Sequence, residues 1–261
     1  LREKPAISQW LATSPQLVLQ YREQWPGIFS VVDFLMENEL SNYYLRNIPV
    51  PVHTKFIEVN KTVIWSLLQY YNPSRYSVPG QSFEEVLGIK QKSYLFNLRW
   101  LDKEMAKETM NGIEVFGLSV EELRKLQWQP DELWVVENET ALYMLPDKRK
   151  GLAICSRGKA LSLLKDIPFF AQTKLYYWGD LDEEGFKMLN DFRQLYRHVQ
   201  SRYMDCNCIT HHLQHLDIQP KFYRTENLNL LTEEESAAFA LLLQKNGRLE
   251  QEKLLQTYVN T

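Results

Sequence analysis

The hydrophobic residues of the chain follow two patterns, and the change falls at Gln129-Pro130-Asp131. Before this break, apolar residues such as Ile57, Ile64 and Leu68 recur at helical spacing. After it, continuous apolar runs alternate with helix-compatible segments, and these runs cover residues 133–136, 152–155 and 175–178. Such runs are typical of a parallel sheet covered by helices. The pattern predicts an α/β protein with a mixed α+β N-terminal half.

Helices separated by proline-containing breaks are predicted for the first half of the chain. One helix is expected to stop at Trp25-Pro26-Gly27, and a second one to run from Val31 to Glu37. Two prolines within residues 47–51 then force extended backbone. A long amphipathic helix follows from Thr54 and ends before Asn72-Pro73.

A hairpin is predicted after these helices. Ser82 and Glu85 have the spacing of a capping box and start one more helix. Strand candidates at residues 94–101 and 113–116 flank a turn at Asn111-Gly112. Helices followed by a hairpin predict a winged-helix module. We therefore expect a helical N-terminal segment at residues 1–52, the winged-helix module at 53–129 and a parallel-sheet domain at 130–261.

Composition narrows the class of protein. With 44% hydrophobic residues the chain can bury a core, and it contains no run of about 20 apolar residues that would cross a bilayer. Three cysteines without framework spacing suit a reducing compartment, so we expect a cytoplasmic protein that does not bind membranes. The start at Leu1, within polar helix-like sequence, predicts that residues 1–52 end a longer arm domain. A net charge of −3 means that any DNA contact is local, or is helped by a partner or a metal ion.

Acidic residues follow two of the apolar runs. Glu137 comes directly after residues 133–136, and Asp180 and Asp182 follow residues 175–178. Side chains at the carboxyl ends of parallel strands gather in one crevice, and two residues spaced by two point to the same side of an extended strand. Paired carboxylates repel unless a hard cation such as magnesium lies between them, and Glu137 would complete the site as a ligand or general acid/base.

A simpler interpretation of these acids is available. Asp180 and Asp182 precede a predicted helix that begins near Glu183, and acidic residues are common helix caps. Glu137 would then be a solvated residue at the end of a strand. Spacing alone favours this capping interpretation.

Several segments around these acids resemble JetD, the Toprim-domain nuclease family of Wadjet systems, which is itself similar to the A subunit of type VI topoisomerases. The resemblance covers most of the chain, and its motifs lie at residues 45–46, 50–58, 98–102, 135–138, 177–186, 193, 203–205, 231–235 and 248–252. It implies a winged-helix module followed by a Toprim-like domain. It also implies magnesium-dependent cleavage of circular DNA beside a condensin-like SMC ATPase complex.

The resemblance assigns Glu137 to the Toprim glutamate and Asp180 and Asp182 to its paired aspartates, with Mg²⁺ as the ion and Mn²⁺ as an alternative. Glu184 and Asp205 are candidate helpers. Because both strands of double-stranded plasmid DNA are cut, two sites and hence a homodimer are expected. The related topoisomerases use a tyrosine as nucleophile, but the sequence around the tyrosines of this chain differs from that context, so water activated by metal is the expected nucleophile.

Weaker candidates are basic or lie near the C-terminus. Arg248 and Glu250 either brace the acidic site or lie on a solvated helical face, where pairing of Arg248 with Glu252 at i,i+4 explains the charges. Arg157 and Lys159 follow a strand end and either touch DNA phosphate or form a plain turn. Further candidate DNA contacts are His53 and Lys55, for which packing is the alternative.

Together these features predict a metal-dependent DNA endonuclease subunit of a bacterial anti-plasmid defence system, which hydrolyses phosphodiester bonds. Two alternatives stay open. The chain is otherwise a non-catalytic Toprim-like module that binds DNA or docks onto the ATPase complex, or it is a tyrosine-using DNA transesterase.

Overall fold

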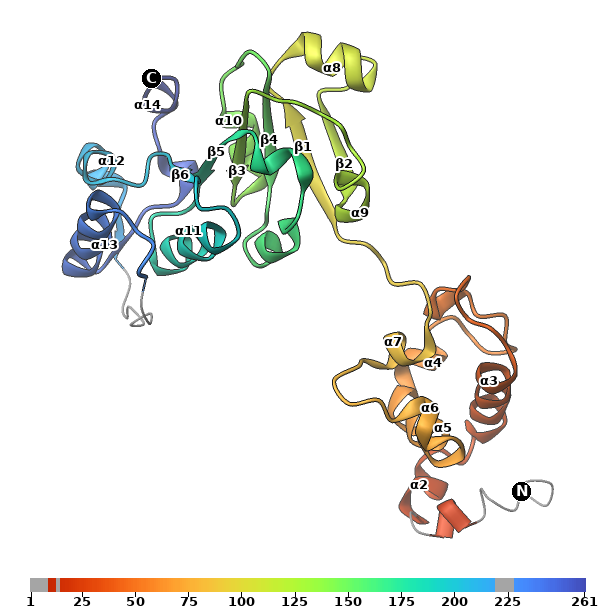
Figure 1. Cartoon of the computed structure of the whole chain (residues 1–261). Helices are drawn as coiled ribbons and strands as arrows, with labels where there is room; N and C mark the ends of the chain where they lie inside the picture. Colours follow the sequence, from red (N-terminus) through yellow and green to blue (C-terminus); the bar gives the residue numbers. More distant parts are fainter. Residues whose placement is uncertain (1–8, 13–14, 219–227) are drawn as a thin grey trace. The chain divides into compact units, whose positions relative to one another are not determined.

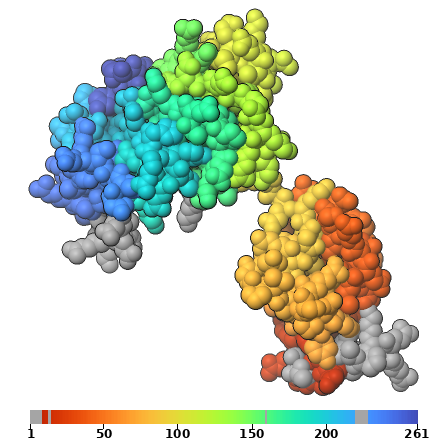
Figure 2. Space-filling model, in the orientation of Figure 1, coloured from red at the N-terminus to blue at the C-terminus, as the bar shows by residue number. Residues whose placement is uncertain are grey.

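A computed structural model describes residues 9–12, 15–218 and 228–261, apart from the side chain of Lys159. The chain divides into two compact units, Leu1–Lys92 and Ser93–Thr261 (Figures 1 and 2). Each unit has a hydrophobic core of its own. In the part of the chain that the structure describes, no helix has the length and apolar character needed to cross a bilayer.

The first unit is built from helices. Its core forms where α3 and α5 pack together, with Val31 and Leu35 of α3 and Ile64 and Leu67 of α5 fully buried. The helical elements are α2 (Pro15–Gln20), α3 (Trp25–Glu37), η1 (Leu45–Asn47), α4 (Phe56–Val59), α5 (Lys61–Tyr71), α6 (Pro73–Tyr76) and α7 (Phe83–Leu87).

Two helix boundaries in this unit differ from the sequence prediction. Helix α3 starts at Trp25 and includes Pro26, because proline in the first helical turn has no intrahelical hydrogen bond to lose. The predicted long helix is divided into α4 and α5 at Asn60, whose side chain donates to the carbonyl oxygen of Phe56 at 3.0 Å. The predicted capping box of Ser82 and Glu85 is confirmed at the start of α7.

The second unit contains a six-stranded sheet in the order β2-β1-β4-β3-β5-β6 (Figure 1). Strands β4, β3, β5 and β6 run parallel, whereas β1 is antiparallel to both β4 and β2. This arrangement confirms the α/β prediction, including the three apolar runs as β3, β4 and β5. The strands are β1 (Leu95–Trp100), β2 (Val115–Ser119), β3 (Glu132–Val136), β4 (Gly151–Cys155), β5 (Lys174–Trp178) and β6 (Gln200–Ser201).

Helices and a small antiparallel pair complete this unit, and α11, α12 and α13 gather at the β5–β6 end of the sheet (Figure 1). Capping boxes at Ser119 and Thr232 begin α9 and α13. The remaining elements are α8 (Lys103–Met110), α9 (Val120–Leu123), α10 (Glu139–Met144), η2 (Lys159–Leu164), η3 (Pro168–Ala171), α11 (Glu183–Leu195), α12 (Cys206–His211), η4 (Leu213–His215), β7 (Asp217–Ile218), α13 (Glu233–Lys245), β8 (Gly247–Arg248), η5 (Gln251–Lys253) and α14 (Gln256–Val259).

The strands predicted as a wing belong to the large sheet. They pair with each other as expected, but α8 lies between them in the chain and β1 also pairs with β4. Phe96, Leu98 and Trp100 on β1 are fully or almost fully buried, so this strand needs neighbours on the sheet and the core beneath it. The predicted boundaries at residues 52 and 129 therefore each fall inside a compact unit.

Candidate active site

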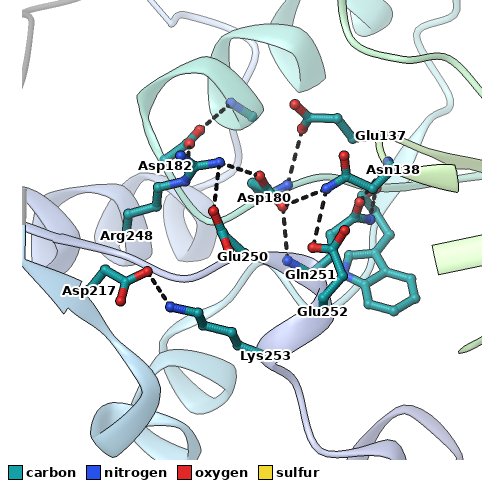
Figure 3. A network of polar contacts seen from close by, with 12 residues as sticks. Glu137, Asn138, Asp180, Asp182, Asp217, Arg248, Glu250, Gln251, Glu252 and Lys253 are labelled. Carbon is teal, nitrogen blue, oxygen red and sulfur yellow. Dashed lines mark hydrogen bonds and ion pairs between the residues drawn. The ribbon is translucent and has the colours of Figure 1, made fainter. Parts of the chain in front are cut away.

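The carboxyl ends of β3 and β5 bring two of the predicted acids together. The strands are parallel neighbours, with Val136 opposite Trp178. Glu137 follows β3 directly, and its Oε2 accepts a hydrogen bond from the backbone N–H of Asp180 at 3.2 Å (Figure 3). Asp180 itself is almost completely buried, with 2% of its surface exposed. The sheet register therefore positions both carboxylates at one edge, as the strand pattern predicts.

Asp182 has two roles in the structure. It is the N-cap of α11, and its Oδ1 accepts from the N–H of Gly185 at 2.8 Å, as the capping interpretation predicts. Its Oδ2 lies 3.0 Å from Nε of Arg248, beside Asp180. Gly185 permits this tight turn, because a Cβ there would lie 2.0 Å from the carbonyl oxygen of Asp180.

A segment from the C-terminal region, residues 247–252, crosses the site and is here called the crossing segment. Leu249 and Leu181 exchange backbone hydrogen bonds of 3.1 and 2.9 Å. The N–H of Gln251 donates to Asp180 Oδ1 at 2.9 Å. The sequence prediction of one helical face carrying Arg248 and Glu252 is wrong, because Arg248 lies in strand β8, which pairs with β7, and only Glu252 lies in a short helix, η5.

Two polar side chains at the site, Asn138 and Gln251, lie within the motifs at residues 135–138 and 248–252 but were not predicted as site residues. Gln251 is fully buried and bridges the two strand ends, since its Nε2 donates to the Trp178 carbonyl at 2.6 Å and its Oε1 accepts from the Asn138 N–H at 2.9 Å. Asn138 Nδ2 donates to Asp180 Oδ1 at 3.4 Å. In the sequence, only their positions next to Glu137 and Glu250 could have indicated a role at the site. The Asn138–Gln251 and Asn138–Asp180 contacts span 113 and 42 residues, so no local pattern records them.

Arg248 is the basic residue in contact with the acids. Its Nη2 lies 2.8 Å from Asp180 Oδ2 and 3.3 Å from Glu250 Oε1, and its Nε lies 3.0 Å from Asp182 Oδ2. Figure 3 shows the guanidinium group between the two aspartates, with Glu250 beside it. Arg248 and Glu250 thus both lie at the site. Their role in bracing the site stays a prediction.

Electrostatics at the site are dominated by crowded negative charge. Burial, followed by repulsion from Asp180, raises the pKa of Glu137 to about 7. Burial also raises the pKa of Asp182, although Arg248 and the Gly185 N–H oppose the shift. The hydroxyl of Tyr177 is buried without a hydrogen-bond partner, and burial together with the nearby acids raises its pKa well above the ordinary value. Such groups are typical of a site that accepts a cation.

The chemistry of these residues fits a hard divalent ion. Glu137, Asp180, Asp182 and Glu250 supply carboxylate oxygens, the donors that magnesium prefers, against the single guanidinium of Arg248. Within the described ranges, no three acidic, histidine or cysteine side chains form a ready-made metal-binding group. In this arrangement Arg248 holds the aspartate oxygens that would face an ion, so the ion and the guanidinium would need the same oxygens.

The remaining candidates are placed elsewhere. Glu184 is exposed in the first turn of α11, where it adds to the negative charge near Asp182. Asp205 caps α12 through a 2.7 Å hydrogen bond from the Cys208 N–H.

The candidate DNA contacts are exposed wherever their side chains are described. Arg157 pairs with Glu139 at 2.7 Å on the surface. His53 and Lys55 are exposed in the first unit. The side chain of Lys159 lies outside the described residues.

Comparison with known families gives two matches. A family model described as Wadjet protein JetD, C-terminal, matches residues 88–261, which include every residue of the site. A second model, described as an uncharacterised N-terminal region conserved in bacteria (DUF3322), matches residues 1–69. No curated protein matches the chain.

Proposed function

We propose that this chain is the subunit that cleaves DNA in a Wadjet defence system, because it belongs to the family of the Wadjet protein JetD. A Wadjet system consists of several subunits. The proposed reaction is metal-dependent hydrolysis of phosphodiester bonds in circular, double-stranded DNA. One observation carries this proposal: Glu137, Asp180 and Asp182 converge from the ends of two parallel strands into a site with excess negative charge. Ligands of α/β sheets bind at such an edge.

Glu137, Asp180 and Asp182 are the residues that would hold the ion, Mg²⁺ or Mn²⁺. When bound, the ion would neutralise charge on the phosphate and favour a nucleophilic water. Asn138 and Gln251 hold Asp180 in place through its Oδ1. A carboxyl group whose pKa is about 7, as for Glu137, can take up or release a proton at neutral pH, which suits general acid/base work.

The partners follow from the same proposal. Cutting both strands of a plasmid needs two sites, so we propose that the chain acts as a homodimer. We further propose that it works in the cytoplasm beside a condensin-like SMC ATPase complex. Arg157, His53 and Lys55 are exposed basic residues and remain candidate DNA contacts.

The test is cleavage of supercoiled plasmid by the full chain with Mg²⁺ or Mn²⁺, comparing wild type with Glu137→Gln and Asp180→Asn. Loss of a carboxylate ligand is expected to lower the rate about 100-fold or more, because metal-assisted stabilisation of the transition state supplies several kcal/mol. Glu58→Gln is the matched control, since this exposed carboxylate pairs with Arg46 in the first unit. Cleavage that survives both site substitutions would refute the assignment of the site.

A non-catalytic docking module is the second candidate, and a specific observation favours it. Arg248 pairs with both aspartates, and the described residues contain no ready-made metal group. If the chain binds DNA but cleaves none with either metal, alone or with its partner complex, this second function replaces the first.

The tyrosine-dependent reaction has weaker support. Of the four tyrosines near the predicted winged-helix region, Tyr76 is buried and Tyr71 and Tyr94 have buried hydroxyl groups. Tyr70 remains, with 38% of its surface exposed. That reaction would be identified if the wild-type protein is trapped covalently on a DNA end and the Tyr70→Phe variant is not.

A further inference from the structure

Arg248 occupies the oxygens that a divalent ion would need. Its guanidinium contacts Oδ2 of both Asp180 and Asp182. The other oxygen of each aspartate already accepts backbone hydrogen bonds, from Gln251 and Gly185 respectively. An ion held by these two Oδ2 atoms would therefore compete with the guanidinium for them.

The contact between Arg248 and Asp182 lacks the paired geometry of a structural salt bridge. Nε of Arg248 lies 3.0 Å from Asp182 Oδ2, yet it is buried without a properly directed hydrogen bond. By contrast, Arg193 binds Glu235 through two nitrogens and two oxygens deep in the same unit. A planar guanidinium gains most from such a paired arrangement. The contact of Arg248 with Asp182 is therefore mainly one of charge, whereas its Nη2 donates a single 2.8 Å hydrogen bond to Asp180 Oδ2.

The side chain of Arg248 has a route away from the aspartates. It is 32% exposed, whereas the side chain of Asp180 is 3% exposed, so the guanidinium approaches from the solvent side. Its backbone is anchored next to the site by the hydrogen bonds between Leu249 and Leu181. Rotation of the side chain alone would therefore open the aspartates and leave the positive charge at the rim.

We propose that Arg248 is a resident counter-cation: it holds Asp180 and Asp182 together when no divalent ion is bound, and it gives up their Oδ2 atoms when the ion enters. This inference rests on the proposed metal site, and it adds that the Arg248 guanidinium competes with the divalent ion for the aspartate oxygens. One guanidinium among four carboxylates leaves excess negative charge, which favours exchange for an ion of higher charge. Arg248 is thus a positioning residue whose removal strengthens metal binding.

The experiment measures binding of Mn²⁺ to the full chain by the electron paramagnetic resonance of the free ion, together with calorimetry. Arg248→Gln is expected to bind Mn²⁺ about tenfold more tightly than wild type, because a competing charge within contact distance is removed. Arg248→Lys keeps the charge and should fall between the two. Arg46→Gln removes the same charge from the first unit, where Arg46 pairs with Glu58, and should match wild type.

The sign of the change separates this inference from a purely structural role. A brace that only shapes the site would make Arg248→Gln bind Mn²⁺ more weakly or equally, and either result overturns the inference. Asp180→Asn reports on the metal site itself. If wild-type binding is present and lost in Asp180→Asn, the proposed site stands whatever Arg248 does. If Mn²⁺ binding is missing in all variants, or unchanged in Asp180→Asn, both proposals fall.

A measurement on the unmutated chain covers the case in which Arg248→Gln does not fold. With ¹⁵N-labelled arginine, the Nε–H signal of Arg248 is assigned by its loss in Arg248→Lys. Addition of diamagnetic Mg²⁺ should shift this signal and speed its exchange with solvent. A signal that does not move while Mg²⁺ binds would overturn the inference.

Discussion

Glu137 and Glu235 lie in the same unit and both lose much of their contact with water, but their surroundings differ. Burial alone would raise the pKa of Glu235, yet hydrogen bonds from Arg193, Ser201 and the Thr232 backbone outweigh it and leave the pKa below the ordinary value. Glu137 accepts one long backbone hydrogen bond and faces Asp180, so its pKa is raised to about 7. The carboxylate of Glu235 is fully hydrogen-bonded and paired with Arg193, whereas the carboxylate of Glu137 has one backbone hydrogen bond and no ion pair among the described residues.

This contrast separates groups that stabilise the fold from groups kept ready for a ligand. Glu235 connects α13 to α11 through Arg193, and every oxygen of its carboxylate has a partner. Asp180 and Asp182 share the guanidinium of Arg248 with Glu250, and this charge acts on Glu137 only through a weak electrostatic interaction. Unbalanced, partly buried charge costs stability, and a fold keeps it where a bound group later compensates.

The largest effect on stability is expected for Glu235→Gln, which leaves Arg193 as an unpaired buried charge. We expect the free energy of unfolding to fall by about 3–5 kcal/mol, as for other broken buried pairs. Urea unfolding followed by circular dichroism measures the loss. The double variant Arg193→Met with Glu235→Leu should recover part of it, because no charge is then left unpaired. A loss below about 1 kcal/mol in the single variant would contradict the structural role of the pair.

A pH series on Glu137 gives the next largest effect. Between the ordinary pKa of 4.5 and about 7, the folded chain keeps a proton on Glu137 that the unfolded chain releases, so stability decreases as pH rises through this window. The rise in pKa corresponds to about 3 kcal/mol at most. Glu137→Gln should lose most of this slope when both proteins are unfolded in EDTA at pH 4.5 to 8. The pKa of Asp182 is also raised, so the Glu137→Gln variant should keep a smaller decrease of stability with rising pH. Equal slopes for both proteins would show that Glu137 is ionised throughout.

The smallest effect is expected for the crossing segment. Gln251→Met leaves the carbonyl of Trp178 and the N–H of Asn138 without their partner in a buried place, which should cost about 1–2 kcal/mol. Gln256→Met is the control. The side chain of Gln256 is exposed, and the Met144 carbonyl that it contacts can accept a hydrogen bond from water instead. Similar thermal unfolding of the two variants would mean that Gln251 does not hold the strand ends together.

Local patterns predicted much of the fold. The three apolar runs became β3, β4 and β5, and the capping boxes at Ser82, Ser119 and Thr232 all start helices. These features depend on residues a few positions apart, which one sequence displays directly. The placement of β1 in the large sheet was not predictable in this way, because its pairing with β4 joins residues more than fifty positions apart.

The order of apolar and acidic residues identifies the residues that follow the strands, and it predicts that Glu137, Asp180 and Asp182 lie at one edge of a parallel sheet. The groups that face these acids depend on how the chain folds. Arg248 reaches Asp180 across 68 residues, and Gln251 reaches Trp178 across 73. Such contacts form because Leu181 and Leu249 pair in the folded chain and bring the crossing segment over the site. The charge balance of the acids is set by that long-range pairing, which no periodicity along the sequence records.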